Sequence, residues 1–244
     1  MVIVLNININ IHLQHESVNT VSLTQSHSLT YIHLPVSCFC SLLDCERTAV
    51  ADMIFLVDGS SSINQTQYKS MQRFMTSLVN TTDVGEDQVR FGAIVYSDNP
   101  ESKFTLNDYK TAKEVRKAIE NLPQPGGNTY TGAALRYALQ YFGQPHGGRR
   151  DKDVTQILFI ITDGAATDPV VLPVWSKEIL NYGIRIYGIG VAGAKESELQ
   201  VMTGDKRRVF YVNNFDALDS LHMNISNELC EDIKPGKPSF FLTK

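Results

Sequence analysis

From Asp52 onward, short apolar segments alternate with longer segments whose apolar residues recur at helical spacing. The strand-like segments are residues 53–57, 89–96, 156–161, 184–189 and 209–212, and a further edge strand is expected near 102–105. Between them, sets such as Tyr68, Met71 and Met75 fall on one face of a helix. This alternation requires right-handed crossovers, so the chain is predicted to be an α/β protein. We expect a doubly wound, mostly parallel, Rossmann-like sheet flanked by amphipathic helices, with one antiparallel edge strand.

Length and composition limit the number of domains and the classes of partner. At 244 residues and 43% hydrophobic content, the chain is expected to form one globular domain with tails. We place that domain at residues 45–232 and a linker or tail at 233–244, whereas 1–44 form an atypical leader or linker that could also be a gene-model artefact. The net charge of −4 comes without a block of Lys or Arg, which argues against nucleic acid as a partner. No apolar run reaches about 18 residues, so no membrane insertion is expected.

Three clusters of small oxygen-bearing side chains fall where strands are expected to end. They are Asp58-Gly-Ser60-Ser-Ser62 after the first strand, Thr129 in a Gly-Gly-Asn-Thr-Tyr-Thr-Gly loop, and Asp163 in Ile-Thr-Asp-Gly after the central strand. In a doubly wound sheet the first and fourth strands flank the switch point, so Asp58 and Asp163 are expected to be near neighbours. Carboxylates among neutral hydroxyls suit a hard divalent cation that retains water ligands. The alternative is that the Ser and Thr side chains cap the helices that follow.

Two other motifs could be taken for cofactor or catalytic sites. Gly188-Ile-Gly-Val-Ala-Gly193 matches G-x-G-x-x-G, but the dinucleotide fingerprint belongs in the first βα turn, and this motif lies late in the chain. We interpret it as a tight turn into a helix near Lys195. Asp58-Gly-Ser60 is similar to the D-x-D motif of aspartyl phosphatases, but Ser60 replaces the acid that would donate a proton. No histidine has a suitable nucleophile beside it, so no catalytic residue and no enzymatic activity are expected.

The cysteines lie only at the edges of this body: Cys38, Cys40 and Cys45 precede the first strand, and Cys230 follows the last helical pattern. Such placement predicts a disulfide between the ends of the domain, and therefore an oxidising compartment. The alternative is a zinc site formed by His33 with the three N-terminal cysteines, but the paired C-x₂-C spacing is absent. Secretion is also favoured by three N-x-[ST] sequons, whose candidate glycosylation sites are Asn64, Asn80 and Asn224.

Taken together, these clusters resemble the von Willebrand factor A domain, a module shared with integrin inserted domains, matrilins and many collagens. That family carries a metal-ion-dependent adhesion site written D-x-S-x-S, followed by a Thr and then by an Asp in a T-D-G context. The corresponding positions here are Asp58, Ser60, Ser62, Thr129 and Asp163, with Thr131 as the second choice for the threonine. The resemblance implies that these residues bind Mg²⁺ (or Mn²⁺), the two acids acting directly or through water, while an acidic side chain of a partner completes the coordination.

Within the family, the phrases Asp52-Met-Ile-Phe-Leu-Val-Asp-Gly-Ser-Ser-Ser-Ile and Gly188-Ile-Gly-Val look most like the A domains of type VI collagen α chains. This implies a secreted extracellular-matrix module that binds protein ligands, such as other matrix proteins or collagen chains. In this fold the chain enters and leaves at the same end, which implies a Cys45–Cys230 disulfide. Two other functions remain open at this point: a structural assembly module that needs no metal, and a metal-assisted phosphatase using Asp58.

Overall fold

The computed structural model describes residues 22–25, 28–31 and 50–233. The chain divides into two compact units, residues 1–45 and 46–244. In the first unit, β1 (Ser22–Gln25) and β2 (Ser28–Tyr31) pair antiparallel. Cys38, Cys40, Cys45 and His33 lie outside the described residues. The zinc alternative therefore remains a prediction, and so do the domain boundaries at residues 44 and 232.

The second unit is built on a six-stranded sheet with the strand order β5-β4-β3-β6-β7-β8. The strands are β3 (Ala51–Asp58), β4 (Val89–Tyr96), β5 (Pro100–Phe104), β6 (Thr155–Thr162), β7 (Arg185–Val191) and β8 (Val209–Val212). All neighbouring strands run parallel except β5, which pairs antiparallel with β4 at one edge. The predicted fold class is therefore confirmed, and β4 and β8 have the predicted bounds.

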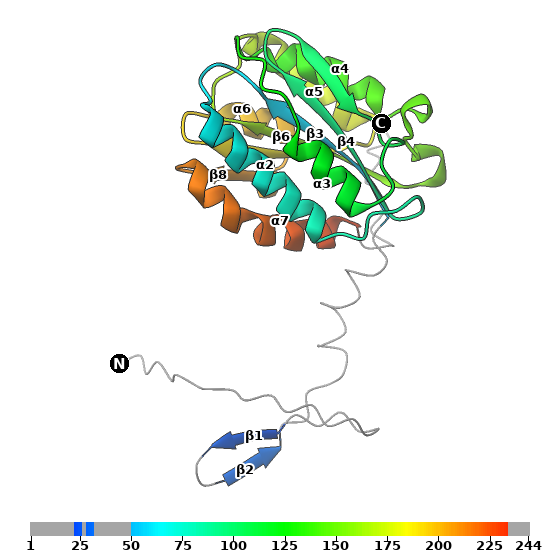
Figure 1. Ribbon diagram of the computed structural model, residues 1–244, viewed down its shortest axis with the longest axis vertical. Helices are drawn as coiled ribbons and strands as arrows, with labels where there is room; N and C mark the ends of the chain where they lie inside the picture. The colour runs from blue at the N-terminus through cyan, green and yellow to red at the C-terminus, as the bar shows by residue number, and fades with distance from the viewer. Residues whose placement is uncertain (1–21, 26–27, 32–49, 234–244) are drawn as a thin grey trace, which may run out of the picture. The chain divides into compact units, whose positions relative to one another are not determined.

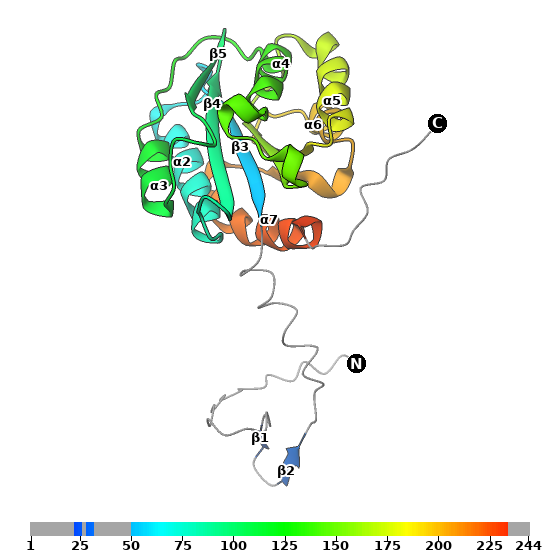
Figure 2. The ribbon, with the colours of Figure 1, turned by 90° about the vertical axis from the view of Figure 1, so that its right-hand side faces the viewer.

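Helices cover both faces of this sheet (Figures 1 and 2). One face is covered by α2 (Gln65–Asn80), α3 (Ala112–Glu120) and α7 (Leu218–Ile233), and the other by α4 (Thr131–Tyr141), α5 (Leu172–Asn181) and α6 (Glu196–Thr203). Residues of β3 alternate between the two hydrophobic layers: Phe55 packs with the first set of helices and Leu56 with the second. Five short 3₁₀ helices lie within the described residues, at Gln144–His146, Arg150–Lys152, Pro169–Val171, Lys206–Arg208 and Phe215–Ala217.

The glycine-rich motif ends in the predicted turn, at Ala192 and Gly193 before α6, but its first two glycines lie within β7. The strand continues to Val191, so Gly188 and Gly190 lie inside it. A Cβ atom added at Gly190 would lie 2.5 Å from a methyl carbon of Leu199, on α6. These glycines therefore allow a helix to pack closely on the sheet, and the turn into α6 comes later.

A buried ion pair at the amino ends of the strands was not predicted from the sequence. The Nε atom of Arg149 lies 2.8 Å from Oδ1 of Asp52, and the backbone N–H of Arg149 donates to Oδ2 at 2.6 Å. The Arg149 side chain also donates to the backbone carbonyls of Ala51, Glu86 and Gln88. The Asp52 side chain is fully buried and that of Arg149 is 6% exposed, so the two charges are satisfied by each other and by the backbone.

Candidate functional site

The site begins with Asp58, the last residue of β3. Residues of β3 and β6 pair one to one up to Val57 and Ile161, so the two strands end at the same edge of the sheet. Oδ1 of Asp58 accepts a hydrogen bond from the backbone N–H of Ser60 at 2.9 Å, and Oδ2 accepts one from the Thr162 hydroxyl at 2.7 Å. The buried carboxylate therefore has a protein donor on each oxygen.

A run of hydroxyls connects this buried carboxylate to a second one at the surface. The Ser62 hydroxyl donates to Oδ1 of Asp163 at 2.7 Å, and the Oγ atoms of Ser60 and Ser62 are 3.0 Å apart. Because the single hydroxyl hydrogen of Ser62 is used in the hydrogen bond to Asp163, Ser60 is the donor in the bond between the two serines. Ser60 is buried, Ser62 is exposed and Asp163 is half-buried. The structure thus brings together the first and third clusters of the sequence.

The loop that contains Thr129 is held against the first cluster by backbone hydrogen bonds. The N–H of Gly126 donates to the carbonyl of Gly59 at 2.9 Å, and the N–H of Ser61 donates to the carbonyl of Gly127 at 3.0 Å. The hydroxyl of Ser61 in turn accepts from the N–H of Gly127 at 2.7 Å. Gly126 and Gly127 have φ values of 73° and 97°, which favour glycine. These contacts fix the second cluster beside the first.

Thr129 is also tied to the loop that follows β6. Its backbone N–H donates to the Thr167 hydroxyl at 3.1 Å, and its carbonyl accepts from the N–H of Thr167 at 2.8 Å. Thr131, the second choice for the site threonine, is buried, with its hydroxyl 3.3 Å from that of the fully buried Tyr96. The hydroxyl of Thr131 thus contacts a core side chain, and the assignment of Thr129 as the third hydroxyl of the site stays a prediction.

The two helices that follow the hydroxyl clusters are capped by other residues. Asn64 caps α2, since its Oδ1 accepts from the N–H of Gln67 at 3.0 Å. The carboxylate of Asp168 caps α4 by accepting from the N–H groups of Gly132 and Ala133, each at 2.9 Å. The interpretation of Ser60, Ser62 and Thr129 as caps is therefore wrong. Sequence reasoning missed Asp168, because it lies 36 positions from Gly132 and no local pattern links the two.

Burial makes charge costly at both acids of the site. The pKa of Asp58 is raised above its usual value by desolvation, against the lowering effect of its hydrogen bonds from Thr162 and Ser60. Desolvation also raises the pKa of Asp163, again opposed by its hydrogen bond from Ser62. In the part of the chain that the structure describes, no three His, Cys, Asp or Glu residues are grouped as metal ligands. Any ion held here would depend on hydroxyl oxygens.

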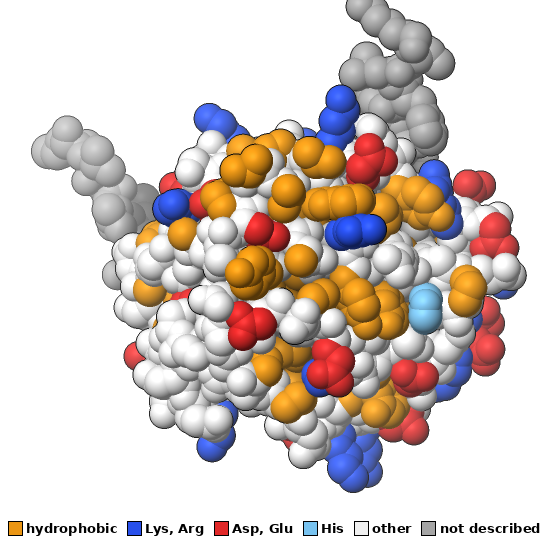
Figure 3. All heavy atoms as spheres, turned by 90° about the horizontal axis from the view of Figure 1, so that it is seen from above, with side chains coloured by type: hydrophobic (Ala, Val, Ile, Leu, Met, Phe, Trp, Pro, Cys, Tyr) orange, Lys and Arg blue, Asp and Glu red, His pale blue; other side chains and the backbone are white. Residues whose placement is uncertain are grey.

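Exposed apolar side chains lie close to the loop after β6. Val170, just before α5, and Val174, in its first turn, are 86% and 56% exposed. Beside them, the guanidinium of Arg136 lies 5.2 Å from the ring centre of Trp175. A hollow of about 380 Å³ has both Asp168 and Trp175 in its lining. Figure 3 shows hydrophobic side chains gathered among charged ones on the face seen from above.

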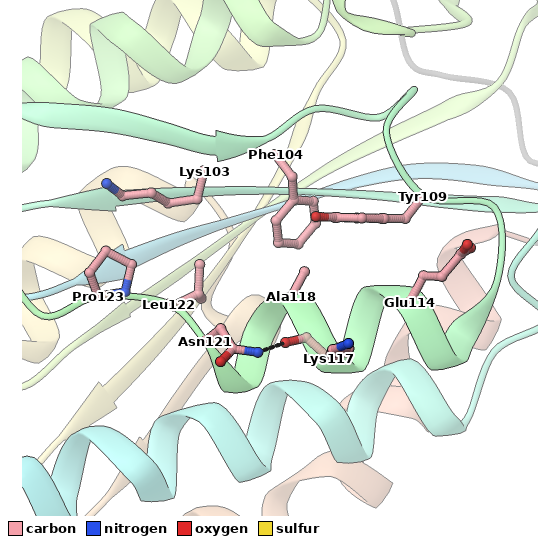
Figure 4. Close-up of a pocket in the computed structure, with 9 residues that line it drawn as sticks. All are labelled: Lys103, Phe104, Tyr109, Glu114, Lys117, Ala118, Asn121, Leu122 and Pro123. Carbon is pink, nitrogen blue, oxygen red and sulfur yellow. Dashed lines mark hydrogen bonds between the residues drawn. The ribbon is translucent and has the colours of Figure 1, made fainter.

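A second hollow, of about 520 Å³, lies between β5 and α3 (Figure 4). Its lining consists of Lys103, Phe104, Tyr109, Glu114, Lys117, Ala118, Asn121, Leu122 and Pro123. The rings of Phe104 and Tyr109 contact each other edge to face, with centres 5.2 Å apart. None of the five predicted site residues lines this hollow, so the oxygen cluster at the strand ends is a separate feature.

The family model for the von Willebrand factor type A domain matches residues 52–224. The collagen α-6(VI) chain of Mus musculus is 38% identical over 191 residues, which are 78% of this chain and 8% of the collagen. The collagen α-1(XII) chain of Notophthalmus viridescens is also 38% identical over 191 residues, which are 20% of its length. This chain thus spans less than a quarter of either relative.

A solved structure of proximal thread matrix protein 1 from the mussel byssus, described as having a zinc-occupied MIDAS motif, has a TM-score of 0.72 and 27% identity. The match covers 76% of this chain and 49% of that protein. The similarity to type VI collagen chains that the sequence motifs predicted is confirmed. The chain belongs to the von Willebrand factor type A domain family.

Proposed function

We propose that this domain is a secreted adhesion or assembly module of the extracellular matrix that binds protein ligands through a divalent metal ion. The metal ligands in this proposal are Asp58, Ser60, Ser62, Thr129 and Asp163. The observation that carries it is the hydrogen-bonded run from Ser60 through Ser62 to Asp163, which joins two loops at neighbouring strand ends. The described residues include no helix that is both long and apolar enough to cross a bilayer.

The chemistry of these donors fits Mg²⁺ or Mn²⁺. Both are hard cations that favour oxygen ligands, and Mg²⁺ keeps an octahedral shell in which water fills the positions that the protein leaves open. Ser60, Ser62 and Thr129 offer neutral oxygens, and the acids supply charge. Because both oxygens of Asp58 already accept protein hydrogen bonds, Asp58 is suited to acting through a bound water. A cation would also offset the cost of the buried charge on this residue.

A partially occupied coordination shell explains why such a site would bind protein and not catalyse a reaction. The ion would remain electrophilic toward a carboxylate from a partner, and that carboxylate would complete the shell. A phosphatase mechanism would need a proton donor two residues after Asp58, but that position is the buried hydroxyl of Ser60. We therefore propose no enzymatic activity.

The partner in this proposal is an acidic segment of another matrix protein or of a collagen chain. The collagen relatives support a matrix location, and zinc in the related byssus protein supports a metal at this site. The exposed Val170 and Val174 beside the loop after β6 could add apolar contacts to the same partner.

The test is binding to a panel of purified matrix proteins, collagens included, in Mg²⁺, in excess chelator, and with an Asp163→Ala variant. Binding in Mg²⁺ that is lost in both other conditions would support the metal-dependent function. Binding that is equal in all three would favour the alternative, an assembly module that does not use the metal.

A Cys45–Cys230 disulfide is a further prediction, and it falls on side chains outside the described residues. Closing so long a loop is expected to raise the free energy of unfolding by about 5 kcal/mol in the chain-entropy model, less any strain in the folded state. Denaturant unfolding with and without reductant measures this difference. Peptide mapping without reduction checks the pairing, and a bond from Cys45 to Cys38 or Cys40 would contradict it.

A further inference from the structure

Among the three sequons, Asn64-Gln-Thr differs in its position relative to the candidate metal site. Asn64 follows Ser62 by two residues, so their Cα atoms are at most about 7 Å apart. Asn64 is the N-cap of α2, and Asn80, the last residue of that helix, lies about 24 Å farther along it. Asn224 lies within α7. A glycan on Asn64 would therefore stand beside the metal site, unlike one on Asn80.

The side chain of Asn64 is oriented so that it could carry a sugar without losing its role as a cap. Its Oδ1 accepts from the backbone N–H of Gln67, and its own backbone N–H donates to Oε1 of Gln67 at 2.8 Å. The residue is exposed, and its Nδ2 has no hydrogen-bond partner among the described residues. The assignment of the two amide atoms is unambiguous, because only the oxygen can accept from an N–H group. The capping box uses the oxygen and leaves the nitrogen facing solvent.

We propose that Asn64 is N-glycosylated and that its glycan shields the candidate metal site from bulky ligands. The proposal rests on the proposed function in one respect, which is that the chain is secreted and so meets the enzymes that attach N-linked glycans. In the transfer, Nδ2 forms a bond to the anomeric carbon of the first sugar of a lipid-pyrophosphate-linked oligosaccharide. The bond from that carbon to the pyrophosphate breaks, the lipid pyrophosphate leaves with the electron pair, and the amide nitrogen loses one proton. Oδ1 remains an acceptor, so the cap of α2 is preserved.

The expected consequence is selection of ligands by size. A branched, hydrated oligosaccharide anchored next to Ser62 occupies volume that a large folded surface would need to approach the ion. A small molecule or a flexible acidic segment can still reach it, because the hydroxyls themselves are not covalently altered. Glycosylation would thus limit the partners of the site without changing its affinity for metal.

The first measurement is site occupancy in protein secreted from eukaryotic cells. Enzymatic deglycosylation in ¹⁸O-labelled water converts each glycosylated Asn to labelled Asp, which peptide mass analysis detects. We expect the label at Asn64, and an unmodified Asn64 would overturn the proposal.

The second measurement tests shielding without requiring metal or ligand. Ser62→Cys is made with the sequon intact and with Thr66→Ala, which removes the sequon at an exposed helical position whose hydroxyl caps nothing. Labelling at residue 62 is followed by peptide mass with a small maleimide and with a polymer-linked maleimide. We expect the intact sequon to slow the bulky reagent severalfold and to leave the small reagent unaffected. Equal rates for the bulky reagent would overturn the proposal.

Two controls separate this proposal from the metal function. Asn224→Gln removes a sequon on α7 and should not change labelling at residue 62. Calorimetric titration with Mn²⁺, on protein that keeps Ser62, should give the same affinity with and without Thr66→Ala. If neither form binds Mn²⁺, the proposed metal function fails, whereas the labelling result still decides whether the glycan shields the site.

Discussion

Replacement of Asp163 by Ala is expected to abolish binding of Mg²⁺ and Mn²⁺ while changing the free energy of unfolding little. Asp163 is half-buried and directly follows β6, and its Oδ1 accepts a hydrogen bond from the Oγ of Ser62 at 2.7 Å. Loss of a residue that only supports a metal ligand typically costs about 10–100-fold in affinity. Loss of one of two carboxylates from a weak site should therefore bring binding below the detection limit of calorimetric titration.

Asp87→Ala is the matched control for the change in charge. Asp87 is exposed and precedes β4, so it lies at the opposite end of the parallel strands from Asp163. Both variants lose one negative charge, and only Asp163→Ala should lose metal. Denaturant unfolding should place Asp163→Ala close to wild type, because the two hydrophobic layers do not include its side chain. Metal affinity equal to that of wild type would refute the assignment of the site.

The sequence predicted the sheet well because short apolar runs leave a distinct pattern, both at the buried strand β4 and at the partly exposed edge strand β8. The segments that became β4 and β8 are apolar runs with polar residues at their ends, and the structure gives them the predicted bounds. The proximity of the first and third clusters also followed from topology alone, since strands that flank the switch point end side by side. The hydrogen bond between Ser62 and Asp163 joins residues 101 positions apart in the sequence.

Features that depend on contacts between distant loops could not be predicted in this way. The cap of α4 comes from Asp168, whose carboxylate accepts a hydrogen bond from the N–H of Gly132. The two residues are 36 positions apart in the sequence. Gly190 suggested a turn because glycine is frequent in turns, but its function is to let Leu199 approach the strand. Asp52 was visible in the sequence as an acid at the start of an apolar strand. Its partner, Arg149, is 97 positions away, and no local pattern identifies it.

Replacement of this arginine, Arg149→Ala, is expected to lower the free energy of unfolding by about 3–5 kcal/mol. The change leaves the fully buried carboxylate of Asp52 without its cation, and it frees the backbone carbonyls of Ala51, Glu86 and Gln88 from their shared donor. A buried charge without a partner costs several times more than an exposed pair contributes. The same loss is expected from Asp52→Asn, which instead leaves the guanidinium without an anion. Urea unfolding of each variant measures the effect.

Arg150→Ala is the neighbouring control for that prediction. Arg150 is exposed and its guanidinium lies 3.7 Å from the ring centre of Tyr182, so its removal should cost no more than about 1 kcal/mol. Because Asp52 lies at the amino end of β3 and Asp58 at its carboxyl end, Arg149→Ala should leave the Mn²⁺ affinity of the folded protein unchanged. A loss of stability no larger than that of Arg150→Ala would show that water replaces the guanidinium at Asp52. The pair would then contribute to the specificity of the fold more than to its stability.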